Sequence, residues 1–353
     1  MLRLGLRRAI VRYTRQLARD FEELLLPGRP LGFLVELVHA SARKDSARSL
    51  DLQFRERGRT GSQLAVYVGL TRILKAHYDG QRRVVALSAD EFYTRQFPTH
   101  GLARSYPLSF AATELQNDMT RYMRNVHVNV RQYKKEGRCQ NWLSHRYGFL
   151  RGGNEWVSVD REVVVGYRDE AEKEKEWEPI KARFGVFGQG LPKVMWNRFE
   201  LDVQGKGVGN ELDALIWCPK SQMLLIAEVK DGSSAAGIYL SPVQVAAYFE
   251  VWRRFFQERP EEALRGIRGL IEQKMRLGLI SGDVALPQRI DAANLSPALI
   301  VQAPNPHSGC WKRLDRIIGL LADQGADYIK GLQVYETADD GAHDISAAWR
   351  EWA

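Results

Sequence analysis

Two short apolar segments, separated by a turn-like connection, constrain the fold of this chain more than any other feature. Glu211–Trp217 and Met223–Lys230 each have the length and apolar content of a strand, and the residues between them include Pro219 and several polar side chains. Proline and polar residues in such a short connection are typical of a tight hairpin. We therefore expect two neighbouring strands whose side chains alternate between the two faces of a sheet.

The expected register brings charged side chains from both strands to one patch at the end of the hairpin. Opposed side chains of neighbouring strands have Cβ atoms about 5 Å apart, so opposed charges interact directly. A slip by one residue would move the side chains of one strand to the other face. The expected pairs are Trp217 with Leu224, Asp213 with Glu228, and Glu211 with Lys230.

This patch has the composition of a divalent-metal site. Two close carboxylates repel each other unless a cation lies between them, and their oxygen atoms are ligands that Mg²⁺ and Mn²⁺ prefer. Such a metal can polarise a phosphodiester and lower the pKa of a bound water, and a neighbouring lysine can stabilise the charge that develops on the phosphate. We expect Asp213, Glu228 and Glu211 to bind the metal and Lys230 to act beside it.

The order of these residues resembles the PD-(D/E)xK nuclease superfamily. The matching segments are Gly209–Ile216, Leu224–Lys230 and Gln244–Tyr248, and the last is similar to the QxxxY motif of RecB-type members. The resemblance covers about residues 170–340, with specific motif support within 209–248. It implies an α/β fold with a restriction-endonuclease-like core, in which a mixed central sheet is flanked by helices.

The resemblance also implies a role for each residue of these motifs. Asp213 and Glu228 would be metal ligands, and Lys230 would position or activate the attacking water. Gln244 would orient the site, and Tyr248 would support the site or the substrate. The catalytic residues would therefore come from two strands and from the helix that follows them.

Members of this superfamily often add a glutamate from a helix that precedes the first core strand. Our candidate is Glu178, with Glu174 one turn earlier and Glu114 as the alternatives. The charge run Asp169–Glu178 contains the first two of these residues, and its pattern fits either a solvated helix or a linker.

Residues 151–353 are expected to form the nuclease domain, because extended and helical patterns alternate along most of this part. Ser241 suits the N-cap of the first helix after the hairpin, and Pro242 suits its first turn. The expected strands are 156–167, 193–203, 211–217, 223–230, 297–303 and 329–336. The expected helices are 242–258, 263–277 and 311–324.

Residues 1–150 differ from the rest in charge and in pattern. They contain 26 Lys/Arg and 13 Asp/Glu, whereas residues 151–353 contain 25 and 30, so the positive charge is concentrated in the first part. Apolar residues at short helical steps, such as Leu64, Val68 and Ile73, predict a mostly helical region. Because neutralising phosphates provides affinity that is independent of base sequence, we expect this region to bind nucleic acid or a protein partner.

A long helix over Phe110–Lys135 is expected to carry much of this positive charge as a stripe. Its basic residues recur mostly at helical spacings, which fits phosphate contact and a plain solvated face equally well. A further basic residue follows the QxxxY motif on the next predicted helix. The candidate nucleic-acid contacts are Arg121, Arg124, Arg131, Lys134, Lys135 and Arg253.

Several classes of protein are disfavoured by composition. The three cysteines lie far apart without CxxC spacing, and the histidines show no HxxxH or HExxH spacing, which argues against a disulfide framework or a zinc site. No apolar run approaches the roughly 20 residues of a membrane span. The basic first residues suit an amphipathic helix better than a presequence, and we expect a cytoplasmic protein.

These inferences lead to the hypothesis of a Mg²⁺- or Mn²⁺-dependent deoxyribonuclease, with bacterial defence or a mobile element as the expected setting. RNA is an alternative substrate. The competing hypothesis is a catalytically inactive nucleic-acid-binding or scaffold protein that has kept a nuclease-like fold. Because no GxxxxGK[ST] motif occurs, an ATPase partner would be a separate chain. The oligomeric state stays open.

Overall fold

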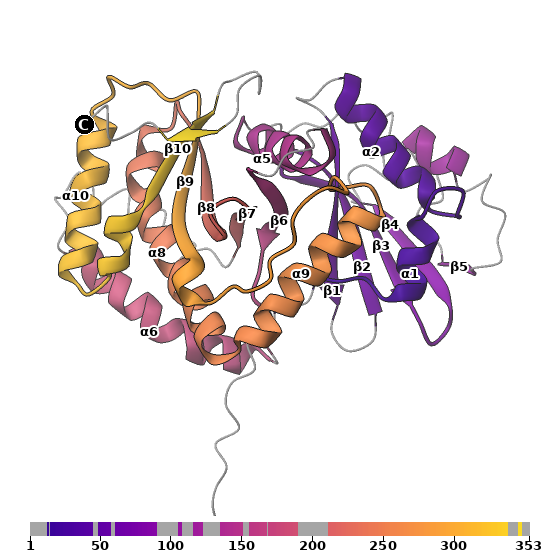
Figure 1. Ribbon diagram of the computed structural model, residues 1–353, viewed down its shortest axis with the longest axis horizontal. Helices are drawn as coiled ribbons and strands as arrows, with labels where there is room; N and C mark the ends of the chain where they lie inside the picture. The colour runs from indigo at the N-terminus through magenta and orange to yellow at the C-terminus, as the bar shows by residue number, and fades with distance from the viewer. Residues whose placement is uncertain are drawn as a thin grey trace, which may run out of the picture.

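The computed structural model contains two β-sheets that lie side by side, with helices packed around both (Figure 1). One sheet has five strands and the other has six. The chain therefore has an α/β architecture with one antiparallel and one mixed sheet. The described residues are 13, 15–44, 49–57, 61–89, 105–107, 116–122, 135–150, 155–167, 169–189, 211–337 and 345–347.

The first sheet is antiparallel and is built from the basic N-terminal part of the chain. Its strand order is β1-β2-β3-β4-β5. Its strands are β1 (Leu50–Arg57), β2 (Gly61–Val68), β3 (Thr71–Asp79), β4 (Val84–Ala89) and β5 (Ser105–Pro107). Two helices precede it, α1 (Arg19–Leu25) and α2 (Gly32–Lys44), and α2 packs on β1.

Helices and strands both occur in the described part of residues 1–150, and the helix predicted from the spacing of Leu64, Val68 and Ile73 is wrong. Leu64 and Val68 lie in β2, and Ile73 lies in β3. Every residue of 62–68 is buried, so β2 lacks the alternation of apolar and polar residues by which a half-exposed strand is recognised. Without that alternation, the four-residue spacing of Leu64 and Val68 matches one face of a helix by coincidence.

The second sheet is mixed and contains the predicted hairpin. Its strand order is β11-β10-β9-β8-β7-β6, with parallel pairing between β8, β9 and β10 and antiparallel pairing elsewhere. Its strands are β6 (Val157–Val163), β7 (Leu212–Cys218), β8 (Met223–Asp231), β9 (Leu295–Gln302), β10 (Gln333–Thr337) and β11 (Ser346–Ala347). Trp217 pairs with Leu224, which confirms the predicted register. The predicted strand 193–203 lies outside the described residues.

Alternate residues of this hairpin point into two separate cores. Leu215 and Ile226 belong to a large cluster with residues of α8 (Ala235–Glu258), whereas Ala214 and Leu225 belong to a smaller cluster with residues of α5 (Lys135–His145). The helices α8 and α5 therefore cover opposite faces of the sheet. The other labelled helical segments are η3 (Arg146–Leu150), α6 (Glu170–Gln189), α9 (Pro260–Arg276), η5 (Ala292–Asn294), α10 (Cys310–Asp323) and η6 (Asp327–Gly331). Residues 116–122, which lie within the predicted helix Phe110–Lys135, are also helical.

The helix α5 begins where the predicted long helix Phe110–Lys135 was expected to end. Lys135 is its first residue, and Gly137 lies inside it. A Cβ at Gly137 would lie 2.5 Å from the backbone nitrogen of Leu70, so only glycine lets α5 approach the turn between β2 and β3 this closely. Much of the predicted helix lies outside the described residues. The division of the chain near residue 150 stays a prediction, although α5 packs on the second sheet.

The helix α8 begins seven residues earlier than predicted, at Ala235 instead of Pro242. Ser234 is its N-cap and accepts a hydrogen bond from the Gly237 backbone N–H at 3.3 Å. Pro242 lies in the helix interior, where it cannot donate to the carbonyl of Ile238 four residues before it. The Ser241 hydroxyl donates to that carbonyl instead, at 2.7 Å, so the proline is tolerated without leaving a buried acceptor unpaired.

We expect Ser241→Ala to lower the free energy of unfolding by about 1–3 kcal/mol, because the Ile238 carbonyl loses its donor in a buried helix. Adding Pro242→Ala to this variant should restore much of the loss, since alanine supplies the missing backbone N–H. Urea unfolding measures both changes, with Ser221→Ala on the exposed hairpin turn as the control. Equal stability of Ser241→Ala and the control would contradict this role for Ser241.

Candidate functional site

Three of the predicted catalytic side chains converge at one end of the hairpin β7–β8. Asp213 is the second residue of β7, and Glu228 and Lys230 lie near the end of β8. Their exposed fractions are only 9%, 2% and 9%, although each residue carries an ionisable group. The apolar hairpin thus holds charged groups in surroundings where they must interact with one another.

The Lys230 ammonium is the centre of this group. Its Nζ lies 2.6 Å from Oε1 of Glu228 and 3.6 Å from Oδ2 of Asp213. A third carboxylate, that of Glu136 on α5, lies 3.5 Å away. The Val229 backbone N–H donates to Oδ2 of Asp213 at 2.8 Å, so the end of β8 holds this carboxylate in place across the hairpin.

The protonation of the cluster follows from its burial and its charge. Burial raises the pKa of Glu228 well above its usual value, and the nearby carboxylate of Asp213 raises it further, against the opposing effect of Lys230. Burial lowers the pKa of Lys230, but the carboxylates of Glu228, Asp213 and Glu136 outweigh it and raise the pKa overall. Lys230 therefore stays a cation, whereas Glu228 is the carboxylate that resists ionisation.

The cluster contains more negative than positive charge when all its groups are ionised. Three carboxylates face one ammonium, and Oε2 of Glu228 is buried without a hydrogen-bond partner. Such an orphaned carboxylate oxygen fits a site that accepts a cation. Within the described part of the chain, no three metal-ligating side chains are already arranged around a common point, and the Lys230 ammonium lies among the carboxylates instead.

Glu136 is a member of the site that the sequence analysis missed. It lies in the first turn of α5, on the face of the sheet opposite α8. The apolar residues Cys139, Trp142 and Leu143 follow it at helical spacings and were a signal for a helix starting near Lys135. The prediction of a single helix ending at Lys135 concealed this signal.

Tyr248 lies beside the cluster, as the QxxxY resemblance implied. Its pKa is raised by burial and then by the carboxylates of Glu228, Asp213 and Glu211, while the backbone of Glu211, which hydrogen-bonds to it, acts in the opposite direction. The hydroxyl therefore stays protonated. Gln244 is one turn earlier, is partly exposed, and lies in the third turn of α8 instead of near its start; its role stays a prediction.

Glu211 lies at the margin of the site instead of opposite Lys230 as expected. It is exposed and hydrogen-bonds to Glu162, a β6 residue that the sequence analysis did not single out. Burial, with the charge of Asp213 and the contact with Glu211, raises the pKa of Glu162 to about 7, although Arg161 acts in the opposite direction. A second carboxyl pair therefore borders the cluster, and Glu136 takes the place near Lys230 that was expected for Glu211.

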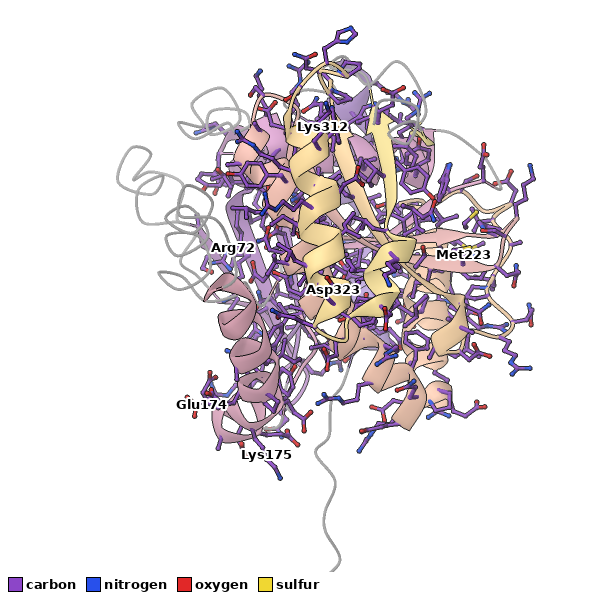
Figure 2. The ribbon with its side chains drawn as sticks, turned by 90° about the vertical axis from the view of Figure 1, so that its left-hand side faces the viewer. Arg72, Glu174, Lys175, Met223, Lys312 and Asp323 are labelled. Carbon is purple, nitrogen blue, oxygen red and sulfur yellow. The ribbon has the colours of Figure 1, made fainter. Side chains whose placement is uncertain are left out.

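The predicted upstream glutamates lie elsewhere. Glu178 is exposed on α6, and Glu174 is exposed on the same helix and projects from the molecule in Figure 2. The inner side of α6 contacts α8 through Trp177, whose ring lies 6.3 Å from that of Tyr248. Glu178 is exposed while its neighbour Trp177 is buried, so Glu178 lies on the outer side of α6. The helical glutamate that contacts Lys230 is Glu136. Glu114 lies outside the described residues.

The predicted basic contacts are only partly described. Lys135 is exposed at the start of α5, directly before Glu136. Arg121 is exposed on a helical segment, and Arg253 is half-buried with its guanidinium 5.4 Å from the ring centre of Tyr328. The positions outside the described residues are Arg124, Arg131 and Lys134.

Comparison with family models, curated proteins and solved structures finds no match to this chain. The residues themselves therefore carry the functional argument. Among the helices of the described residues, none has the length and apolar character needed to cross a membrane.

In the absence of divalent ions, we expect the contribution of Glu228 to the free energy of unfolding to fall as pH rises above about 5. The folded protein holds the Glu228 proton more tightly than the unfolded chain does, because the pKa of this carboxyl is raised on folding. Glu228→Gln should therefore remove this contribution and change the slope of stability against pH. Glu162, whose pKa is raised to about 7, acts in the same direction as Glu228, whereas the buried His145, whose pKa is lowered, acts in the opposite direction.

Urea unfolding in EDTA at several pH values measures this difference in slope. The matched control is Glu174→Gln, because Glu174 is exposed on α6 and should keep the slope of the wild type. An unchanged slope in Glu228→Gln would show that the Glu228 carboxyl ionises in the folded protein as freely as in the unfolded chain.

Proposed function

We propose that this protein is a Mg²⁺- or Mn²⁺-dependent nuclease that hydrolyses phosphodiester bonds in DNA. The observation that carries the proposal is the cluster in which the buried carboxylates of Asp213 and Glu228 and the partly exposed carboxylate of Glu136 surround Lys230. An excess of buried negative charge opposes folding unless a cation compensates for it. A purely structural ion pair would need one carboxylate for Lys230, whereas this site has three.

The donor set fits a hard divalent cation. Carboxylate oxygens are the preferred ligands of Mg²⁺ and Mn²⁺, and the unpartnered Oε2 of Glu228 is available for such a contact. Asp213, Glu228 and Glu136 are the residues that would hold the ion. A bound divalent ion supplies Lewis acidity, which polarises the phosphodiester and lowers the pKa of a bound water.

The protonation of the site decides what its own side chains do. Because the pKa of Lys230 is raised, its ammonium stays protonated at neutral pH and acts as a hydrogen-bond donor and a positive charge, not as a base. It would orient the attacking water and stabilise the negative charge that builds up on the phosphate. The Tyr248 hydroxyl, whose pKa is raised by burial and by the nearby carboxylates, stays protonated and would donate a hydrogen bond to the site.

The arrangement of the elements supports the finer fold assignment, a restriction-endonuclease-like core. The PD-(D/E)xK resemblance implies an acidic residue and an ExK triplet on neighbouring strands, which fits Asp213 on β7 and Glu228-Val229-Lys230 on β8. It also implies a glutamate from a helix before the first core strand, which fits Glu136 on α5 ahead of β6. In this proposal Glu136, and not Glu178, is the glutamate that a helix adds to the site.

The positive charge of the chain supports a nucleic-acid substrate. The formal net charge is +8, and the exposed Lys135 directly precedes Glu136 in α5. A basic side chain at this position can contact a phosphate next to the scissile one. DNA is the proposed substrate because most members of the superfamily that the chain resembles act on DNA.

We expect the protein to cut supercoiled and linear DNA with Mg²⁺ or Mn²⁺ but not in EDTA. Lys230→Ala should lower kcat by about a hundredfold or more, because the charge on the reacting phosphate loses a positioned donor. Lys220→Ala is the matched control, since Lys220 is exposed on the turn of the same hairpin. Circular dichroism verifies that the Lys230 variant is folded.

Four other results of this assay would contradict the proposal. Equal cutting by Lys230→Ala and the wild type would show that Lys230 is not part of the active site. Cutting in EDTA would show that the reaction needs no divalent ion. DNA binding without cutting under every metal would favour the inactive binding or scaffold protein. Cutting of labelled RNA but not of DNA would show that RNA is the substrate, and the assignment of the catalytic site would stand.

Lys135→Ala should weaken DNA binding without removing the chemistry. A lost phosphate contact lowers the slope of log K against log salt concentration by about 1 and acts on all sequences alike. Fluorescence anisotropy with Ca²⁺ at several salt concentrations measures this slope. Lys330→Ala is the control, because Lys330 is exposed and contacts Asp327 at 3.0 Å. An unchanged slope for Lys135→Ala would remove Lys135 from the binding surface.

A further inference from the structure

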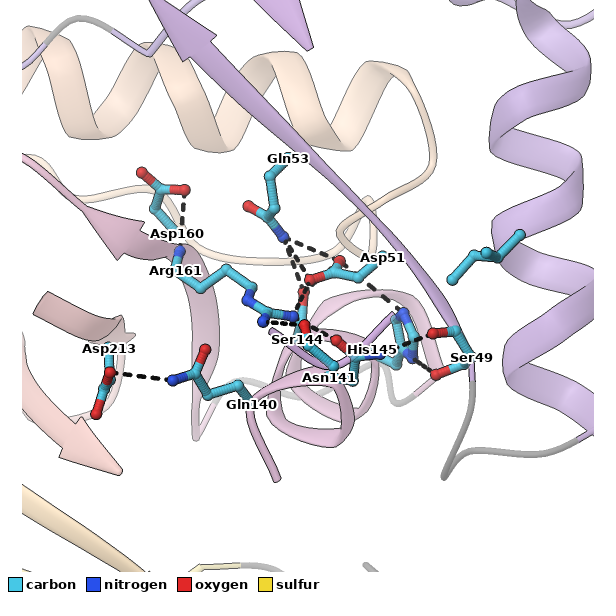
Figure 3. A network of polar contacts seen from close by, with 12 residues as sticks. Ser49, Asp51, Gln53, Gln140, Asn141, Ser144, His145, Asp160, Arg161 and Asp213 are labelled. Atoms are coloured by element: carbon cyan, nitrogen blue, oxygen red, sulfur yellow. Dashed lines mark hydrogen bonds and ion pairs between the residues drawn. The ribbon is translucent and has the colours of Figure 1, made fainter. Parts of the chain in front are cut away.

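The helix α5, which brings Glu136 to the site, is held by a buried polar network that joins the two sheets (Figure 3). The Asn141 side chain donates to the Ser49 carbonyl at 2.7 Å and accepts a hydrogen bond from Arg161 of β6. Arg161 in turn contacts Asp51 of β1 at 2.9 Å, and the Ser144 hydroxyl donates to the same Asp51 carboxylate at 2.9 Å. The position of α5 therefore depends on β1, a strand of the N-terminal sheet.

Gln140, the residue before Asn141, connects α5 to the candidate metal site. Its side chain is 2% exposed, and its Nε2 donates to Oδ1 of Asp213 at 3.0 Å. The orientation of the amide follows from chemistry, because an ionised carboxylate only accepts hydrogen bonds and so requires the NH₂ group. Figure 3 shows Gln140 reaching from α5 to Asp213, next to the part of the network that contains Arg161.

Two donors on separate elements thus fix both oxygens of Asp213. Gln140 of α5 donates to Oδ1, and the Val229 backbone of β8 donates to Oδ2. The carbonyl oxygen of Gln140 is buried without a hydrogen-bond partner. An unpaired buried acceptor is unfavourable for stability, so the contact with Asp213 accounts for this glutamine better than the stability of the fold does.

We propose that Gln140 is a positioning residue, which holds the Asp213 carboxylate in the orientation needed to bind the divalent ion. The contact makes the N-terminal sheet a support for the metal site, through β1, Arg161 and α5. This inference rests on the proposed function. Partners that orient a metal-binding side chain typically change metal affinity by about tenfold to a hundredfold when they are removed.

The test compares Gln140→Met, which keeps the shape of the side chain and removes its amide, with the wild-type protein. We expect the Mn²⁺ concentration for half-maximal DNA cleavage to rise by about tenfold to a hundredfold. At saturating Mn²⁺, KM for DNA should stay unchanged. Direct Mn²⁺ titration, followed by electron paramagnetic resonance, should give the same loss of affinity.

A matched variant separates this role from an effect on folding. Gln273 is also a buried glutamine with side-chain hydrogen bonds, to Leu17 and Glu22, but it joins α9 to α1. Gln273→Met should lower the melting temperature and leave the affinity for Mn²⁺ unchanged. If Gln140→Met fails to fold, Gln140→Asn keeps a polar amide that is one methylene too short for Asp213, and should show the same loss of affinity.

The outcomes distinguish this inference from the proposed function. If the wild type binds Mn²⁺ and Asp213→Asn does not, but the Gln140 variants bind it as tightly as the wild type, Gln140 is not a positioning residue while the metal site stands. If KM for DNA rises and Mn²⁺ affinity stays constant, Gln140 acts on the substrate and the inference is wrong. A wild type that binds no Mn²⁺ overturns the proposed function itself.

Discussion

The contact of the Lys230 ammonium with three carboxylates is the interaction on which the candidate site depends. Each of these charges would be unfavourable alone in a buried position, and together they still leave an excess of negative charge. Glu228 shows the consequence, because its pKa is raised and one of its oxygens has no hydrogen-bond partner. A divalent cation would remove this excess and satisfy that oxygen, which links the stability of the site to its proposed chemistry.

The fold brings these groups together from parts of the chain that are distant in sequence. The hairpin β7–β8 supplies Asp213, Glu228 and Lys230, while α5 supplies Glu136 from the opposite face to α8. The position of α5 depends in turn on the buried contacts of Arg161 with β1. The N-terminal part of the chain, which was expected to bind nucleic acid or a protein partner, is thus structurally connected to the site through its sheet.

The sequence predicted the local part of this arrangement and missed the long-range part. The apolar hairpin fixed its own register, so the proximity of Asp213 and Glu228 could be predicted from pattern alone. The five-stranded sheet was missed because burial on both faces removes the alternation of a strand, as in β2. Glu136 and Gln140 were missed because their role depends on how α5 packs, which no local pattern encodes. The predicted start of α8 at Pro242 was too late. The Ser241 hydroxyl donates to the Ile238 carbonyl, to which proline cannot donate, so the helix continues through Pro242.

The most direct measurement of the central claim is the position of a divalent ion in the protein. Crystals soaked in Mn²⁺ and measured for anomalous scattering should show a peak at about 2 Å from carboxylate oxygens of Asp213 and Glu228. The Lys230 ammonium should then lie beside the ion instead of between the carboxylates. A peak at another place, or no peak at this cluster with Mn²⁺ in excess, would contradict the assignment of these residues as a metal site.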